Sequence, residues 1–221
     1  MITGAIFDVD GVLLDSMGVW DEMGVHYLTR QGKKPEPDLS EVLFTKHMTE
    51  SAEYMQQCYE LPWTPEEILE QIVEMMVEYY AKVIKPKEGV LDLLKILKQK
   101  GIPVTVATAG DRRLAAVGLE SSGLLPYIDK LFTCGEVGAG KDSPAVYQAA
   151  WKSMGTELSG TWVFEDSLHG ILTAAEAGFP TVGIYDSASE KNIEKIKENC
   201  TYYMKDFMER DKFLEFAHLY R

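Results

Sequence analysis

Residues 4–12, Gly-Ala-Ile-Phe-Asp-Val-Asp-Gly-Val, join a short apolar run to two carboxylates. A continuous apolar run of this length predicts a strand of a parallel sheet that is buried on both faces. Asp8 ends this predicted strand, and Asp10 follows it in a turn. Because ligands of open α/β sheets bind at the carboxyl ends of the strands, we expect a functional site beside Asp8.

The chain beyond residue 86 alternates between strand patterns and helix patterns. Short β-branched runs predict strands, and longer amphipathic stretches predict helices. The predicted strands cover 103–108, 130–134, 161–165, 180–185 and 201–204, and the predicted helices cover 89–100, 112–122, 144–154, 168–178 and 189–198. Repeated βα units of this kind favour an α/β fold with a Rossmann-like, doubly wound parallel sheet.

A stretch of helical patterns without a predicted strand separates the first strand from this alternation. Thr64, Pro65 and Glu67 have the order of a helix start, with an N-cap, a first-turn proline and a capping-box acid. We therefore predict an inserted helical cap domain at 15–86, and a core domain formed by 1–14 together with 87–221.

The 221-residue chain has 35 acidic and 22 basic residues, which gives a net charge of −13. This charge repels nucleic-acid phosphates and anionic lipids, so we expect neither nucleic acid nor a membrane as a partner. No apolar stretch is long enough to span a bilayer, the start lacks the pattern of a signal peptide, and the three cysteines are widely spaced. These features predict a cytoplasmic protein with reduced thiols, and we expect a monomer or a weak homodimer.

Polar side chains stand at the ends of three predicted strands. Asp8 and Asp10 follow the first strand, Thr108 ends the second, and Glu165 and Asp166 end another. Four carboxylates that converge at one edge of a sheet cannot all be ionised without a compensating cation. Hard oxygen ligands with room for water and phosphate favour Mg²⁺, so the sequence predicts a magnesium site here.

Other interpretations of these motifs stay open. The acidic pair after the first strand also fits a helix cap, whereas Gly11 stands at the wrong position for a calcium-binding EF-hand loop. Residues 135–141, Gly-Glu-Val-Gly-Ala-Gly-Lys, fit the P-loop pattern of kinases and NTPases, yet Asp142 stands where a hydroxyl should hold Mg²⁺. We favour a glycine-rich loop that delivers Lys141 as a point charge to one phosphoryl group.

These motifs together resemble the haloacid dehalogenase superfamily. Residues 7–12 (Phe-Asp-Val-Asp-Gly-Val) look like its first motif, and Val-Ala-Thr at 106–108 is similar to its second. Lys141 stands where the third-motif lysine belongs, and residues 164–170 (Phe-Glu-Asp-Ser-Leu-His-Gly) look like the fourth motif. The helical insert after the first motif resembles the subgroup with a C1 cap, which contains β-phosphoglucomutases and many small phosphatases.

The resemblance implies a role for each matching residue. Asp8 would be the nucleophile that becomes an aspartyl phosphate, and Asp10 would be the general acid and base. Thr108 and the amide of Ala109 would bind phosphate oxygens, and Lys141 would neutralise charge on Asp8 and on the phosphoryl group.

The resemblance also implies a ligand set for Mg²⁺. Asp8, the backbone carbonyl of Asp10, and Asp166 would hold the ion, with Glu165 nearby in a water-mediated or alternate role. The expected enzyme is a Mg²⁺-dependent phosphatase acting on a small phosphorylated metabolite, such as a sugar phosphate.

Three departures from the β-phosphoglucomutases favour hydrolysis over isomerisation. The histidine that helps prime their general acid is Trp20 here, their cap arginine has no counterpart at 45–50, and their lysine after the second motif is Asp111. A sugar phosphomutase is therefore the main alternative, followed by a P-loop kinase or NTPase.

Several side chains are weaker candidates for contacts with substrate. Trp20, Lys46 and His47 would approach from the cap, and Arg112 and Arg113 follow the second motif. Packing within the cap explains Trp20 better than closure over substrate, and a solvated helix face explains the charged residues equally well.

Overall fold

A computed structural model describes residues 1–44, 46 and 48–219, apart from the side chain of Phe44. A six-stranded sheet in the order β5-β4-β1-β6-β7-β8 forms its centre, and every pair of neighbouring strands is parallel. Its strands are β1 (Gly4–Phe7), β4 (Val104–Thr108), β5 (Lys130–Thr133), β6 (Thr161–Glu165), β7 (Thr181–Ile184) and β8 (Tyr202–Met204). The predicted doubly wound α/β sheet is confirmed.

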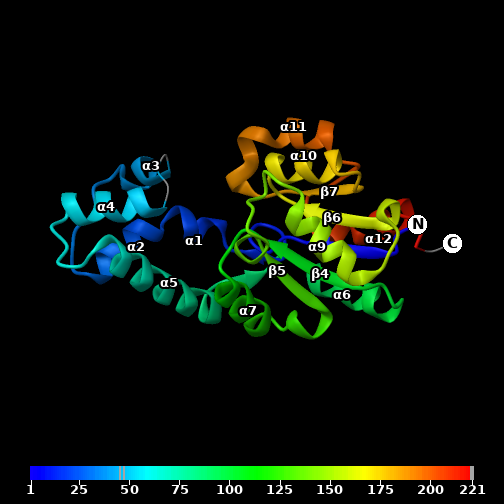
Figure 1. Cartoon of the computed structure of the whole chain (residues 1–221), viewed down its shortest axis with the longest axis horizontal. Helices are drawn as coiled ribbons and strands as arrows, with labels where there is room; N and C mark the ends of the chain where they lie inside the picture. Colours follow the sequence, from blue (N-terminus) through cyan, green and yellow to red (C-terminus); the bar gives the residue numbers. More distant parts are fainter. Residues whose placement is uncertain (45, 47, 220–221) are drawn as a thin grey trace.

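Helices cover both faces of the sheet and form a separate lobe beside it (Figure 1). The helices next to the sheet are α6 (Val90–Gln99), α7 (Arg112–Ser121), α8 (Cys134–Val137), α9 (Ala145–Met154), α10 (Leu168–Glu176), α11 (Ile193–Asn199) and α12 (Arg210–Phe216). The lobe contains α1 (Met17–Asp21), α2 (Met23–Arg30), α3 (Leu39–Phe44), α4 (Met48–Cys58) and α5 (Pro65–Lys82).

Alternate residues of the central strand β1 face opposite layers of the core. Ala5 and Phe7 pack into one buried cluster, in which Phe7 stacks on Phe164 with ring centroids 4.1 Å apart. Ile6 packs into a second cluster on the other face, together with side chains of α9. Because successive side chains of a strand point to opposite faces, an unbroken apolar run is what a strand covered on both sides requires.

Local signals place the start of the long helix α5 correctly. The Thr64 hydroxyl accepts a hydrogen bond from Glu67 N at 3.3 Å, and the Glu67 carboxylate accepts one from Thr64 N at 2.8 Å. Pro65 occupies the first turn, where its missing N–H group costs no helical hydrogen bond. The predicted capping box is confirmed.

A two-stranded antiparallel ribbon was not predicted. It pairs β2 (Leu14–Asp15) with β3 (Lys85–Pro86), at the two points where the chain passes between the sheet and the helical lobe. Strands of two residues are too short for a periodic signal, so the pairing follows from the meeting of two distant segments. The division of the chain at residues 15 and 86 stays a prediction.

The segment predicted as one helix over 189–198 is divided in the structure. A 3₁₀ helix runs from Ser187 to Asn192 and precedes α11. Asp186 begins this segment, because its carboxylate accepts a hydrogen bond from Ala188 N at 2.9 Å. No helix among the described residues combines the length and the apolar composition needed to cross a membrane.

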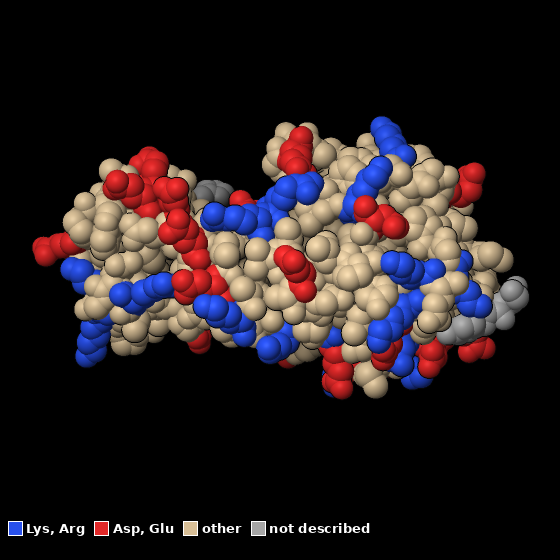
Figure 2. All heavy atoms as spheres, turned by 90° about the horizontal axis from the view of Figure 1, so that it is seen from below, with Lys and Arg blue, Asp and Glu red and all other residues tan. Residues whose placement is uncertain are grey.

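Charge is distributed unevenly over the two lobes. On the face shown in Figure 2, acidic side chains gather on the upper part of the helical lobe and basic side chains lie along its lower edge, whereas the two kinds are interspersed over the sheet-containing lobe. Helices α4 and α5 supply seven glutamates to the helical lobe, at positions 50, 53, 66, 67, 70, 74 and 78. The lobe that inserts after the first strand therefore carries much of the excess negative charge of the chain.

Candidate active site

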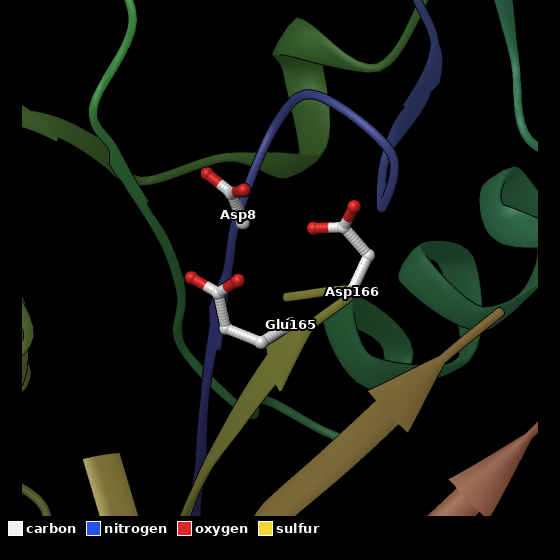
Figure 3. Close-up of side chains that lie close together, drawn as sticks. All are labelled: Asp8, Glu165 and Asp166. Carbon is white, nitrogen blue, oxygen red and sulfur yellow. The ribbon is translucent and has the colours of Figure 1, made fainter. Parts of the chain in front are cut away.

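The carboxyl ends of three neighbouring strands bring the predicted site residues together. Because β1 lies between β4 and β6, Asp8 stands between the ends of the strands that carry Thr108 and Glu165. Figure 3 shows the side chains of Asp8, Glu165 and Asp166 gathered at this edge. The site thus lies where open α/β sheets bind their ligands.

Three buried carboxylates form a cluster that fits a divalent cation. One oxygen from each of Asp8, Glu165 and Asp166 lies within 4.8 Å of the others, and the three residues are 6%, 0% and 5% exposed. Buried charges of one sign repel each other unless a cation is added. The donor set consists only of hard oxygens, which suits a divalent cation of the Mg²⁺ or Ca²⁺ type.

The raised pKa values of two carboxyl groups in the cluster are consistent with a site for a divalent cation. Burial raises the pKa of Asp8 to about 7, although the charge of Lys141 opposes the rise and that of Glu165 adds to it. Burial, together with the charges of Glu165 and Asp8, also raises the pKa of Asp166. A cation bound here would relieve this repulsion and return the carboxylates to their ionised form.

Lys141 supplies the positive charge of the site. Its ammonium group lies 2.8 Å from Asp8 Oδ1 and also forms an ion pair with Glu165. Burial lowers the pKa of Lys141, but the charges of Asp8 and Glu165 outweigh burial and raise it. The lysine is therefore a fixed cation beside the candidate nucleophile.

The local structure around Lys141 does not match a P-loop. Residues 134–137 form the short helix α8, which starts at a capping box made by Thr133 and Glu136. Helix α9 begins at Ala145, so Lys141 precedes it by a turn instead of opening it. A P-loop requires its lysine at the start of the helix, beneath the phosphates.

Two glycines allow carboxylates of the acidic cluster to lie against the backbone. Gly11 has φ +79°, and a Cβ atom at this residue would overlap Asp166 Oδ2. A Cβ atom on Gly170 would lie 2.7 Å from Glu165 Oε2 and 2.8 Å from Glu165 Oε1. Each glycine therefore makes room for one carboxylate.

Gly11→Ala is expected to weaken divalent-cation binding at least about tenfold, because the new methyl group displaces Asp166. The left-handed backbone adds roughly 1–2 kcal/mol of strain. Gly123→Ala is the matched control, since Gly123 has φ +70° with no atom within 4 Å of the added Cβ. Calorimetric titration with Mn²⁺ measures the effect. Equal affinities in the two variants would show that Asp166 does not depend on the space at Gly11.

Asp10 is held by hydroxyl groups that the sequence analysis did not identify. Its Oδ1 atom accepts a hydrogen bond from Ser16 Oγ at 2.6 Å and another from the hydroxyl of Tyr80. Trp20 Nε1 donates to the Tyr80 hydroxyl at 2.9 Å. Because an indole N–H can only donate, the Tyr80 hydroxyl accepts from Trp20 and directs its own hydrogen to Asp10. Trp20 is thus linked to the candidate general acid, in addition to packing in the lobe.

The remaining residues predicted to contact substrate or phosphate differ in their surroundings. Thr108 is buried, and its hydroxyl oxygen accepts a hydrogen bond from Gly110 N at 3.0 Å, while Ala109 follows at the exposed strand end. Arg112 binds Glu136 at 2.6 Å, which accounts for its charge without a substrate. Lys46 lies over the ring of Tyr54, 5.4 Å from its centroid. His47 lies outside the described residues, and the substrate contact of Arg113 stays a prediction.

Fold and site together define an α/β enzyme that has a helical insertion and an acidic edge with the donor set of a divalent-cation site. The haloacid dehalogenase-like hydrolase family matches residues 2–178. The chain belongs to this family, and within it to the phosphatases, which are phosphoric monoester hydrolases.

Individual relatives agree with this assignment. The chain is 29% identical over 180 residues to validoxylamine A 7'-phosphate phosphatase of Streptomyces hygroscopicus subsp. limoneus, covering 81% of this chain and 84% of that protein. It is 26% identical over 186 residues to phosphorylated carbohydrates phosphatase of Thermotoga maritima, covering 84% and 86%. A Thermotoga maritima structure, provisionally named a β-phosphoglucomutase, has TM-score 0.85 and 24% identity, covering 97% and 99%. This last likeness concerns the fold.

Proposed function

We propose that the chain hydrolyses a small phosphomonoester, such as a sugar phosphate, through an aspartyl-phosphate intermediate on Asp8. The observation that carries the proposal is the contact between Asp8 and Lys141, 2.8 Å apart, inside a buried acidic cluster at the carboxyl edge of the sheet. Two relatives whose names specify validoxylamine A 7'-phosphate and phosphorylated carbohydrates support the substrate class.

The first step transfers the phosphoryl group to the protein. An oxygen of Asp8 attacks phosphorus, and the bond between phosphorus and the ester oxygen breaks. Asp10 gives its proton to the departing oxygen, which leaves as an alcohol. Lys141 stabilises the charge that develops on the phosphoryl oxygens, and Thr108 with the amide of Ala109 orients them.

The second step releases phosphate. Asp10, now ionised, takes a proton from a water molecule as that water attacks phosphorus, and the bond to Asp8 breaks. Phosphate leaves, and both aspartates return to their starting states. We propose that the helical cap at 15–86 covers the substrate during the first step and selects it.

Mg²⁺ is the proposed cation of this site. Asp8, Asp166 and the carbonyl of Asp10 would hold it, with Glu165 nearby, and the bound ion would offset the negative charge of the phosphoryl group. The residues fit this group because they are buried, oxygen-donating and mutually repulsive without it.

Isomerisation of a sugar phosphate is the second candidate function, and we expect hydrolysis instead. Asp10 is held by Ser16 and Tyr80, with Trp20 behind Tyr80, and no histidine takes part in these bonds. A mutase must keep its phosphoenzyme from water until the sugar returns in the opposite orientation. Groups for that task are replaced here by Trp20 and Asp111.

Assays with a panel of sugar phosphates and Mg²⁺ are expected to show phosphate release, with negligible conversion of β-glucose 1-phosphate to glucose 6-phosphate even when the bisphosphate primer is present. Both products are followed in one reaction. A parallel preparation of Asp8→Asn reports any contaminating phosphatase. Efficient isomerisation with little phosphate release would refute the hydrolytic function and support the mutase.

A further inference from the structure

The carboxylate of Glu165 is held by several side chains at the edge of the sheet. Its carboxylate is fully buried at the end of β6 and receives hydrogen bonds from three side chains. Tyr147 donates to Oε1 at 2.7 Å, Ser167 donates to Oε2 at 3.2 Å, and Lys141 also binds Oε1. The three donors come from α9, from the start of α10 and from the loop before α9, so they define one position for the carboxylate.

Tyr147 is a permanent, neutral donor in this arrangement. Its side chain is fully buried in the cluster between the sheet and α9. Burial and the charge of Glu165 raise the pKa of Tyr147, so it keeps its proton. A carboxylate can only accept, so the Tyr147 hydroxyl must donate to Glu165. It thereby satisfies an oxygen of Glu165 without adding a second positive charge next to Lys141.

The backbone at Gly170 lies against the carboxylate of Glu165. The carboxylate lies so close to this glycine that an added Cβ would be 2.7 Å from Oε2. The backbone of α10 and the Tyr147 hydroxyl both contact this carboxylate, so Glu165 has little freedom to rotate. Lys141, which bridges Glu165 and Asp8, is positioned by the same contact.

We propose that Tyr147 is a positioning residue of the metal site: its hydrogen bond holds Glu165 where this carboxylate both completes the acidic cluster and anchors Lys141 beside Asp8. The inference rests on the proposed metal-dependent function. Hydrogen-bond partners of metal-site carboxylates commonly change metal affinity about 10- to 100-fold when they are removed.

The test is Tyr147→Phe, which removes one oxygen and keeps the ring. The dissociation constant of Mn²⁺ is measured by calorimetry without substrate, and kcat and KM are measured with p-nitrophenyl phosphate. We expect the Mn²⁺ dissociation constant to rise about tenfold and kcat to fall, with KM changed by less than about twofold. A rise of less than about threefold would overturn the proposal.

Tyr27→Phe is the matched control, because Tyr27 is 1% exposed and its hydroxyl donates to Gln71 Oε1 at 3.2 Å, within the helical lobe. Both variants lose one buried hydroxyl donor, so a general loss of stability lowers both melting temperatures. Only Tyr147→Phe is expected to change Mn²⁺ binding.

A double-mutant cycle with Glu165→Gln identifies the partner. If Tyr147 acts through Glu165, Tyr147→Phe changes Mn²⁺ affinity much less in the Glu165→Gln protein than in the wild type. Equal effects in both backgrounds would contradict this route. Because binding is measured without turnover, a protein that binds Mn²⁺ but hydrolyses no phosphomonoester refutes the proposed function alone. Absence of Mn²⁺ binding by the wild type would refute the role of Tyr147 as well.

Discussion

Asp8→Asn is expected to lower turnover of a phosphomonoester on the order of a thousandfold or more, because a neutral amide does not attack phosphorus. The substitution keeps the size and shape of the side chain. It also keeps Lys141 in place, since Glu165 continues to bind that ammonium group. Steady-state phosphate release measures the effect, and near-normal turnover would refute the assignment of the nucleophile.

The same variant is expected to be more thermostable than the wild type when no metal is bound at pH 8. The pKa of Asp8 rises from 3.8 to about 7 on folding, so the folded protein binds this proton more tightly than the unfolded chain. The stability of the metal-free wild type therefore decreases as the pH rises from about 4 to 7. The amide introduced by Asp8→Asn carries no charge, so the variant avoids the free-energy cost of ionising a buried carboxylate. Its melting temperature should therefore exceed that of the wild type at pH 8.

Asp92→Asn is the control for both measurements. Asp92 is an exposed acid of α6 that lies 3.5 Å from Lys95 and 3.6 Å from Arg210. Ion pairs of an exposed acid contribute at most about 1 kcal/mol each to stability. We expect near wild-type turnover and no gain in stability at high pH. A stability gain of the same size in both variants would show that the effect belongs to net charge and not to the acidic cluster.

Removal of divalent cations is expected to abolish activity, and Mg²⁺ is expected to restore it. Asp8, Glu165 and Asp166 lie together in a buried site, so a phosphate group cannot approach them without a cation to offset the charge. Asp166→Ala should raise the Mg²⁺ concentration needed for half-maximal activity on the order of a hundredfold or more, whereas Glu165→Ala should raise it far less.

The measurement is a Mg²⁺ titration of chelator-treated protein, combined with Mn²⁺ calorimetry in the absence of substrate. Asp129→Asn is unsuitable as a control, because Asp129 accepts a hydrogen bond from Val104 N at 2.8 Å and supports the sheet. Asp92→Asn is again the better comparison. Full activity in excess chelator would rule out the metal-dependent mechanism.

The sheet and its active edge were predictable because their signals are local. The run at 4–8 is apolar up to its final acid, as a strand with two covered faces requires, and the capping box at Thr64 identifies the start of α5. Acids and a threonine at strand ends must meet once the strands are parallel neighbours. The predicted strand ends at residues 8, 108 and 165 therefore indicated one candidate site at the edge of the sheet.

Other parts of the site had no local signal. Tyr80 and Trp20 lie 60 residues apart, and Tyr80 lies 70 residues from Asp10. The sequence around Tyr147 indicates only a core position of an amphipathic helix. Its link to the acidic cluster is visible only in the hydrogen bond from its hydroxyl to Glu165. The ribbon of β2 and β3 could not be predicted from the sequence, because neither strand is long enough to show a periodic pattern.

By itself the sequence determined the alternation of strands and helices in the core, the choice of Asp8, Asp10 and Asp166 as site candidates, and the expectation of a compensating cation. These conclusions depend on periodicity and on the charge of side chains at strand ends, which are properties of contiguous residues. Lys141 was chosen from its glycine-rich loop and from the resemblance to the family. Only the tertiary structure decided which oxygens meet and which donors hold them. Hydrogen bonds require partners within about 3 Å, and that distance between residues far apart in the chain is set by the packing of the lobe, the sheet and α9.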